Sequence, residues 1–274
     1  MSGLEGVPWP EGADWWATSI AEIRPGVIRF RGYPVEELIG NIGLAEVIWL
    51  LIVGELPSAG QASLLEAALV ASVDHGPQAP SIASARMAAT TGVGLNSAIA
   101  TGVNMLGDVH GGAGQQCMEL YLQVAGAVDG GATLASATSG AVAEARRRDP
   151  FVPGFGHRFH PVDPRVAPLL DAVRSAAADD VVGGRFVGVA LAVEREVAEI
   201  VGRPVPMNID GATAVVFCEL GLEPPLGRGL FVLSRSVGIL AHAWEETTGP
   251  SRLKGPMPPS VLPTYTGPDL RHVE

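Results

Sequence analysis

The strongest constraint on the fold is the helical spacing of apolar residues in long, alanine-rich runs that short turns containing Gly or Pro separate. In the clearest run, five apolar side chains recur at intervals of four and three residues, the pattern of one helix face: Phe186, Ala190, Val193, Val197 and Ile200. Similar patterns predict helices after residue 35 and over residues 47–53, 58–74, 81–106, 117–124, 132–148, 166–177 and 212–220. One face of a last long helix is marked by Leu233, Val237, Leu240 and Trp244. Extended pieces are expected only around Gly26 and Gly32, so the predicted fold class is all-α.

Composition limits the core and the partners. The 274 residues are 47% hydrophobic but only 5% aromatic, so Ala, Val, Leu and Ile must build the core. The small side chains of residues 81–106 let helices approach closely, and we expect a tight helix–helix contact there, within the chain or between subunits. A net charge of -11 argues against nucleic acid or an anionic membrane as the main partner.

The remaining composition gives a cellular context. Cys117 and Cys218 lie in apolar, helix-like segments, which favours buried free thiols over a disulfide or a nucleophile. No CxxC or HExxH spacing indicates a metal site. Residues 1–16 lack a basic region before an apolar run, and residues 47–53 are too short to span a bilayer. We therefore expect a cytoplasmic protein with no membrane partner.

Three polar segments interrupt the apolar runs and carry the candidate catalytic groups. They are residues 108–113 (DVHGGA), 153–158 (PGFGHR) and 207–211 (MNIDG), which contain His110, His157 and Asp210. A carboxylate can move a proton at carbon, and two imidazoles can stabilise oxygens on either side of a carbon–carbon bond, so the set suits enolate chemistry. The structural alternatives are core histidines with satisfied hydrogen bonds, and an Asp210 that only caps a helix.

Nine short motifs in order give the chain a resemblance to a known family. They occupy residues 26–38 (GVIRFRGYPVEEL), 54–57 (GELP), 74–75 (DH), 110–113 (HGGA), 154–158 (GFGHR), 163–165 (DPR), 208–210 (NID), 234–238 (SRSVG) and 265–267 (YTG). Together they resemble the citrate synthase superfamily over nearly the whole chain. The resemblance implies a citrate synthase-like fold in which a small helical domain (116–218) closes over an active-site cleft of a large helical domain (1–115 and 219–274).

The resemblance also implies roles for residues. Asp210 would exchange a proton with the methyl carbon of acetyl-CoA, and His110 would stabilise the enol at the thioester oxygen. His157 would lie at the carbonyl oxygen of oxaloacetate. The substrate carboxylates would be held by His75, Arg165 and Arg235. The chemistry agrees, because arginine binds carboxylates in a bidentate geometry that lysine lacks.

The resemblance also implies ligands and partners, and purely structural roles for some of these residues stay open. Arg158 is the candidate contact for CoA phosphates, the CoA thioester is a substrate, and no metal or tightly bound cofactor is required. A homodimer is expected. His75 could instead be a helix C-cap and Arg235 a salt-bridge partner at the edge of the core, while His160 and His242 are interpreted as structural histidines.

Departures from the synthases point to a particular branch. Residues 74–77 (DHGP), 208–211 (NIDG) and 231–236 (FVLSRS) resemble the citryl-CoA-cleaving module of ATP-citrate lyase. The synthases' RPR before YTG is replaced by residues 260–264 (SVLPT). Our hypothesis is a citryl-CoA lyase that forms acetyl-CoA and oxaloacetate, with a separate citryl-CoA synthetase as a pathway partner.

Other activities remain open. HGG and YTG favour a compact citrate synthase or 2-methylcitrate synthase, which would condense acetyl-CoA or propionyl-CoA with oxaloacetate. A related hydroxyacyl-CoA lyase and a non-catalytic acyl-CoA-binding paralogue are further alternatives; the intact His110, His157 and Asp210 argue against the paralogue.

Overall fold

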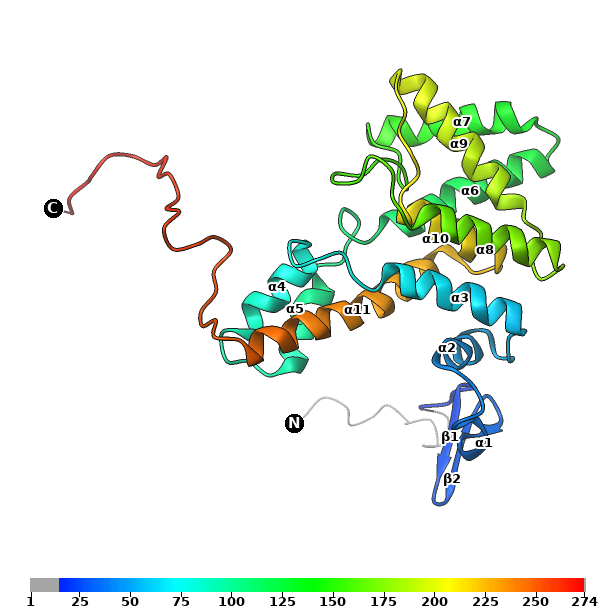
Figure 1. Cartoon of the computed structure of the whole chain (residues 1–274), viewed down its shortest axis with the longest axis horizontal. Helices are drawn as coiled ribbons and strands as arrows, with labels where there is room; N and C mark the ends of the chain where they lie inside the picture. The colour runs from blue at the N-terminus through cyan, green and yellow to red at the C-terminus, as the bar shows by residue number, and fades with distance from the viewer. Residues whose placement is uncertain (1–14, 274) are drawn as a thin grey trace, which may run out of the picture. The chain divides into compact units, whose positions relative to one another are not determined.

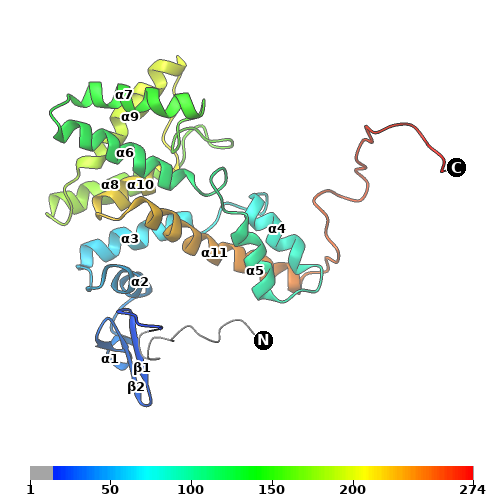
Figure 2. The same ribbon diagram turned by 180° about the vertical axis from the view of Figure 1, so that it is seen from behind.

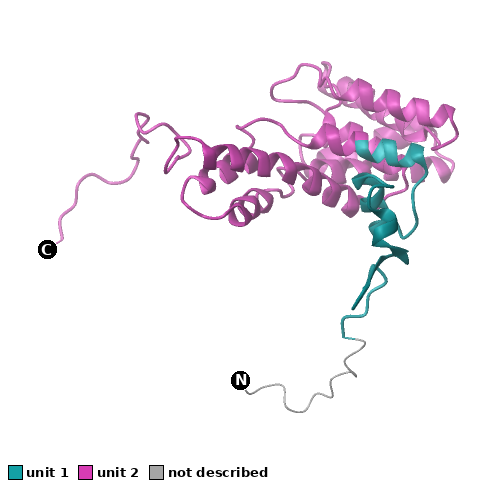
Figure 3. Cartoon of the chain, turned by 60° about the horizontal axis from the view of Figure 1, so that its bottom comes forward, with its two compact units in different colours: residues 1–66 teal, residues 67–274 magenta. Residues whose placement is uncertain are grey.

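The computed structural model describes residues 15–273 and divides into two compact units that meet in sequence at Glu66 and Ala67 (Figure 3). The expected N-terminal segment without a targeting signal lies almost entirely outside the described residues. Within them, eleven helices and one small sheet confirm the all-α prediction. None of these helices is long and apolar enough to cross a membrane.

The first unit begins with the predicted extended pieces. They form an antiparallel sheet of β1 (Ala21–Arg24), β2 (Val27–Phe30) and β3 (Tyr33–Pro34), in which Ala21 pairs with Phe30 and Phe30 with Tyr33. Arg31 and Gly32 both have positive φ in the two-residue turn between β2 and β3, the geometry that suits the twist of a hairpin. The Arg31 guanidinium then donates two hydrogen bonds to the Leu51 carbonyl, which joins the sheet to the helix that carries Leu51.

Three helices follow the sheet: α1 (Val35–Leu38), α2 (Leu44–Val53) and α3 (Ala59–Ser72). Ser58 caps the start of α3, since its Oγ accepts the Gln61 N–H at 3.3 Å and the Gln61 side chain accepts the Ser58 N–H at 2.9 Å. Such a reciprocal pair satisfies two N–H groups that the helix start leaves without partners.

The second unit contains the remaining helices. They are α4 (Pro80–Ala89), α5 (Leu95–Asn104), α6 (Ala113–Asp129), α7 (Leu134–Arg148), α8 (Val166–Ala178), α9 (Arg185–Val201), α10 (Ile209–Glu219) and α11 (Pro224–Thr248). Figures 1 and 2 show α4 and α5 beside one half of α11, and α6 to α10 grouped at its other end. The predicted amphipathic helix is α9, and it ends at Gly202 with φ 74°.

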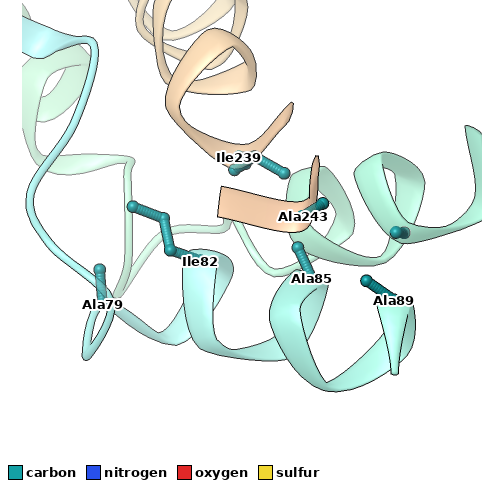
Figure 4. Packing of buried hydrophobic residues seen from close by; sticks show 7 residues of the cluster. Ala79, Ile82, Ala85, Ala89, Ile239 and Ala243 are labelled. Atoms are coloured by element: carbon teal, nitrogen blue, oxygen red, sulfur yellow. The ribbon is translucent and has the colours of Figure 1, made fainter. Parts of the chain in front are cut away.

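The predicted tight contact of small residues occurs within the chain. Ile82, Ala85 and Ala89 of α4 pack against Ile239 and Ala243 of α11 (Figure 4). At Gly102 of α5, an added Cβ would lie 2.7 Å from an Ile239 methyl group and from the Ser81 carbonyl oxygen. Glycine is therefore required there by close approach rather than by a turn.

The centre of the second unit is α10, whose residues are nearly all buried and which packs against α6, α8 and α9. Both cysteines are buried free thiols, as predicted. This central position matters for the site, because the first turn of α10 carries Asp210.

The structure corrects the prediction of which face of the last helix is buried. The helix exists as α11, but the four marker side chains are between 42% and 57% exposed: Leu233, Val237, Leu240 and Trp244. The neighbouring stripe that contains Leu230, Ile239 and Ala243 is buried instead. Because α11 is apolar around most of its circumference, spacing alone does not identify the face that packs against the rest of the chain.

Candidate active site

The backbone holds His110 and fixes its tautomer. Its segment precedes α6, and the Gly107 N–H donates to the His110 carbonyl at 2.9 Å. The backbone N–H of buried Ser81, in the first turn of α4, donates to His110 Nε2 at 3.2 Å. An N–H only donates, so Nε2 is the acceptor and the proton of the neutral ring lies on Nδ1.

The charge state of His110 is also set by its surroundings. Burial, followed by the positive charges of Arg235 and Arg158, lowers the pKa of His110 below its usual value of 6.5. The imidazole is therefore neutral near pH 7 and offers an Nδ1–H. A neutral donor of this kind can hydrogen-bond a developing oxyanion.

The other imidazole, His157, has the opposite tautomer. It lies in the loop between α7 and α8, and its Nδ1 accepts the N–H groups of Phe159 at 3.0 Å and His160 at 3.1 Å. Nε2 therefore carries the proton of the neutral ring. Burial, and then the charges of His160 and Arg165, lower the pKa of His157, while Asp163 opposes them.

The carboxyl group of Asp210 is left free for chemistry. Asn208 is the N-cap of α10, and its Oδ1 accepts the N–H groups of Asp210 at 2.9 Å and Gly211 at 3.3 Å. The capping interpretation of Asp210 is therefore wrong. No hydrogen bond among the described residues uses its carboxylate. Burial raises the pKa of Asp210, and the opposing charges of Arg235 and Arg165 do not cancel this.

The segments that carry His157 and Asp210 are joined through their backbones. The Asn208 N–H donates to the Gly154 carbonyl at 2.9 Å, and the Gly156 N–H donates to the Pro206 carbonyl at 2.7 Å. Asn208 Nδ2 adds a bond of 2.7 Å to the Gly156 carbonyl. At Gly211 an added Cβ would lie 2.6 Å from the Gly154 carbonyl oxygen, so glycine permits the two segments to meet.

Arg165 is held by a buried aspartate. Asp163 is only 2% exposed and accepts the Arg165 Nε and Nη2 groups at 2.9 and 2.7 Å, together with the Ile209 backbone N–H at 3.1 Å. Burial alone would raise the pKa of Asp163, but these hydrogen bonds outweigh it and lower the pKa to about 2.

The other arginine, Arg235, is buried with little compensation. It is 4% exposed, its Nε donates to the Ser72 carbonyl at 3.0 Å, and its guanidinium lies 4.8 Å from the centre of the Phe231 ring. It forms no ion pair within residues 15–273, so the predicted salt-bridge alternative is not what the structure shows. A buried cation is costly unless something compensates its charge, which makes Arg235 a strong candidate for holding an anionic ligand.

The electrostatics show which groups share the site. The charge of Arg235 lowers the pKa of Asp210, of His110 and of His75, so one guanidinium acts on all three groups. Burial is the main cause of the lowered pKa of His75, and the charges of Arg165 and His157 add to it.

Three imidazoles lie together at this site. The His75 ring centre is 5.0 Å from that of His157 and 6.0 Å from that of His160, and His157 and His160 are 4.6 Å apart. The structure therefore places His160 beside two of the predicted site residues, where sequence reasoning expected only a structural histidine. The sequence carries a weak signal for this, since His160 is three residues beyond His157.

The three imidazoles have potential metal-ligand atoms within 4.8 Å of one another. The hydrogen bonds oppose that use, because His157 Nδ1 is occupied by two N–H groups and its Nε2 carries the proton. The adjacent charges of Arg165 and Arg235 also disfavour a cation. We therefore interpret the group as a site for an anion.

All seven predicted site residues lie in the second unit. His242 is placed as a structural histidine, as expected, with Nε2 3.2 Å from Asp74 Oδ1. Arg158 is exposed, and its charge reaches His110. The sequence interpretation missed Ser81 and Asp163, although the latter lies in the recognised DPR motif.

Comparison with known proteins identifies the family of the chain. The family model for the C-terminal domain of citrate synthase matches residues 3–64 and 59–254. The chain is 31% identical to the citrate synthase of Haloferax volcanii over 196 residues, which are 70% of this chain and 48% of that protein. It therefore spans about half the length of that curated relative.

Two solved structures extend the comparison. A citryl-CoA lyase from Hydrogenobacter thermophilus superimposes with a TM-score of 0.82 and 31% identity, over 95% of this chain and 98% of that one. A citrate synthase from Pyrobaculum aerophilum gives a TM-score of 0.65 and 25% identity, over 85% of this chain and 56% of that one. The family match and these structural similarities agree: the chain belongs to the citrate synthase family.

Proposed function

We propose that the protein is a citryl-CoA lyase that cleaves citryl-CoA to acetyl-CoA and oxaloacetate. The observation that carries the proposal is the complementary chemistry of His110, His157 and Asp210, two neutral imidazoles of opposite tautomer and one desolvated carboxyl group. The lyase branch is favoured by the similarity to the citryl-CoA lyase of H. thermophilus, which extends over nearly the full length of both chains.

In the cleavage direction, the proton of the citryl hydroxyl passes to Nε2 of His157 and the carbon–carbon bond breaks. The departing acetyl-CoA enolate develops charge on its thioester oxygen, where the Nδ1–H of His110 donates a hydrogen bond. Asp210 then delivers its proton to the enol carbon. A carboxyl group with a raised pKa keeps that proton more readily than one exposed to water.

The tautomer of His157 places a condition on the first step. Nε2 accepts a proton only if it does not already carry one, so the Phe159 and His160 N–H groups must release Nδ1 when citryl-CoA binds. After cleavage the imidazolium of His157 carries a proton on each ring nitrogen, and Nε2–H faces the new carbonyl of oxaloacetate. Loss of the Nδ1 proton to solvent, matched by reprotonation of Asp210, then lets Nδ1 accept the Phe159 and His160 N–H groups again. The described geometry therefore corresponds to the oxaloacetate side of the reaction.

The tautomer of His157 also favours a second candidate, a citrate or 2-methylcitrate synthase. An Nε2–H on His157 is already suited to polarise the carbonyl of oxaloacetate for condensation, and the H. volcanii relative is named a citrate synthase. The two candidates differ in whether the citryl thioester is hydrolysed, because a synthase releases free CoA and a lyase does not.

In this proposal, cationic and imidazole side chains hold the substrate carboxylates and the CoA phosphates. Arg235, which has no protein carboxylate partner within residues 15–273, holds one carboxylate, and His75 and Arg165 complete that side of the site. Arg158, which is exposed and whose charge acts on the pKa of His110, contacts the CoA phosphates. Neither a metal nor a tightly bound cofactor is part of this scheme. Closure of the small domain (116–218) over the large domain (1–115 and 219–274) excludes water from the enol.

The proposed homodimer forms through an exposed apolar stripe on α11. Its exposed apolar stripe of Leu233, Val237, Leu240 and Trp244 would be covered in a homodimer. A second copy is the occupant we propose, because a self-complementary helix face suits a two-fold interface. A cytoplasmic location and a separate citryl-CoA synthetase in the pathway complete the proposal.

The test is oxaloacetate release from citryl-CoA, coupled to malate dehydrogenase. Asp210→Asn is the control, because it keeps the volume of the side chain but cannot deliver the proton. We expect steady release by the native protein, with a loss of at least about a hundredfold in the variant, the size of general acid catalysis. An equal rate in both proteins would refute the proposed role of Asp210.

A further inference from the structure

His242 on α11 connects two other helices to the segment that carries His75. The Arg86 guanidinium on α4 lies 2.9 Å from His242 Nδ1, and His242 Nε2 lies 3.2 Å from Asp74 Oδ1. A guanidinium only donates hydrogen bonds. Nδ1 therefore accepts from Arg86, the proton of the neutral ring lies on Nε2, and Nε2–H donates to Asp74.

Arg86 is itself held firmly, which fixes the direction of the His242 ring. Its Nε donates to Glu246 Oε1 at 2.7 Å, and its Nη1 lies 2.9 Å from Glu245 Oε2. Glu246 is buried and also accepts from Lys254 Nζ at 2.6 Å. The chain of contacts thus runs from the residues after α11, through Glu246 and Arg86, to His242.

At its other end the chain reaches the turn that presents His75. The second oxygen of Asp74, Oδ2, accepts the Gly76 N–H at 3.2 Å, and Gly76 has φ +84°. The backbone of α11 also comes close at this point, since a Cβ on Gly238 would lie 2.3 Å from the Val73 carbonyl oxygen. Asp74 therefore ties both sides of the His75 backbone to α11.

The His75 ring has no hydrogen bond of its own among the described residues, and its neighbours are the rings of His157, Phe159 and His160. Its direction consequently depends on the backbone of residues 74–76. We propose that His242 is a positioning residue, which acts through Asp74 to hold the His75 imidazole in place for a substrate carboxylate. This proposal rests on the carboxylate-binding role given to His75 above.

Steady-state kinetics of His242→Ala and His242→Gln test the proposal. Removal of one positioning hydrogen bond should raise KM for the carboxylate-bearing substrate roughly three- to tenfold while kcat stays within about twofold. The Gln side chain places an amide N–H near the original Nε2, so KM should return to within about twofold of the native value. A purely structural role predicts lower thermal stability in the Ala variant with unchanged KM, which would overturn the proposal.

Asp74→Ala breaks the same link from its other end and guards against a His242 variant that does not fold, since the Asp74 side chain is 43% exposed. The double variant should raise KM no more than either single variant, because both remove one link. Additive effects would refute a shared pathway. Arg174→Gln, which breaks the exposed Arg174–Asp171 pair of α8, is the matched control and should leave KM unchanged.

A second readout does not depend on activity. The carbon–proton NMR signals of the His75 ring, assigned from a His75→Gln variant, should move in His242→Ala and stay near the native position in His242→Gln. Unmoved His75 signals in His242→Ala would overturn the proposal. If the native protein shows neither citryl-CoA cleavage nor citrate synthesis, the proposed function fails, and the His75 signals still decide whether His242 positions that ring.

Discussion

Asp163 Oδ2 accepts the backbone N–H of Ile209 at 3.1 Å, while both of its oxygens bind the Arg165 guanidinium. A single buried carboxylate thereby joins the loop that follows His157 to the first turn of α10, which carries Asp210. The spacing between two groups of the site depends on this contact. Asp163 is not proposed to touch the substrate, yet its removal should affect both stability and activity.

Asp163→Asn should reduce stability at neutral pH. The folded-state pKa of Asp163 is about 2, below the usual 3.8. The ionised carboxylate therefore contributes stability above pH 3.8, and this is lost as the pH falls from about 4 through 2. A shift of this size corresponds to about 2 kcal/mol. Urea unfolding at pH 7 and pH 3 should show a larger difference between native and variant proteins at pH 7; a constant difference would contradict the assignment.

Asp210→Asn should raise the stability of the folded protein at neutral pH, in contrast to Asp163→Asn, and should abolish activity. Burial raises the pKa of Asp210, so the ionised carboxylate is less stable in the folded protein than in the unfolded chain, and this cost is present above pH 3.8. The amide removes the charge. Calorimetry at pH 7 should show a higher Tm for Asp210→Asn than for the native protein. A lower Tm would argue that Asp210 has an unseen stabilising partner.

The pH dependence of kcat/KM should report the lowered imidazole pKa values. Burial lowers the pKa of both His110 and His157, so both imidazoles become protonated at a lower pH than an ordinary histidine. The acidic limb that comes from their protonation should therefore be centred at a pH below 6.5. This is measured from pH 4.5 to 9 with a substrate that does not titrate in that range, and His110→Gln should lack the corresponding limb. A limb centred above 6.5 in the native enzyme would contradict neutral imidazoles.

Val237→Glu and Trp244→Glu should each convert the proposed homodimer to a monomer, because a buried unpaired carboxylate in an apolar interface is strongly unfavourable. Sedimentation equilibrium measures the mass directly. Ile200→Glu, at an exposed apolar position on α9, is the control and should leave the mass unchanged. A native monomer would rule out the interface.

Arg158→Ala should raise KM for the CoA thioester with little change in kcat, since loss of a phosphate contact removes binding that is equal in the ground and transition states. Arg147→Ala on α7 tests whether any exposed arginine has this effect. Equal KM values for the native protein and Arg158→Ala would remove Arg158 from the CoA site.

The sequence predicts the groups of the site better than their supports. His110, His157 and Asp210 stand out because each interrupts an apolar run beside glycines. The roles of Ser81 and Asp163 depend on contacts between residues 29 and 46 positions apart, which local patterns do not encode. His160 lies outside the recognised motifs, and its neighbour His75 is far away in sequence, so the sequence does not indicate that the two rings lie together.

The fold shows the same division. Helix ends at Ser58 and Gly202 follow from local chemistry, a capping hydroxyl at the first and a glycine with positive φ at the second. Which stripe of α11 is buried depends on the helices that pack against it, so four exposed side chains on that helix looked like core. The proposed boundaries of the small domain, at residues 116 and 218, also do not follow from local sequence patterns, because they depend on which parts of the chain move together.

The most direct measurement is a paired assay on one preparation of purified protein. One arm supplies citryl-CoA and follows oxaloacetate with malate dehydrogenase; the other supplies acetyl-CoA and oxaloacetate and follows free thiol. A citryl-CoA lyase gives fast oxaloacetate release in the first arm and no thiol release in the second. Steady thiol release in the second arm would contradict the lyase and identify a synthase.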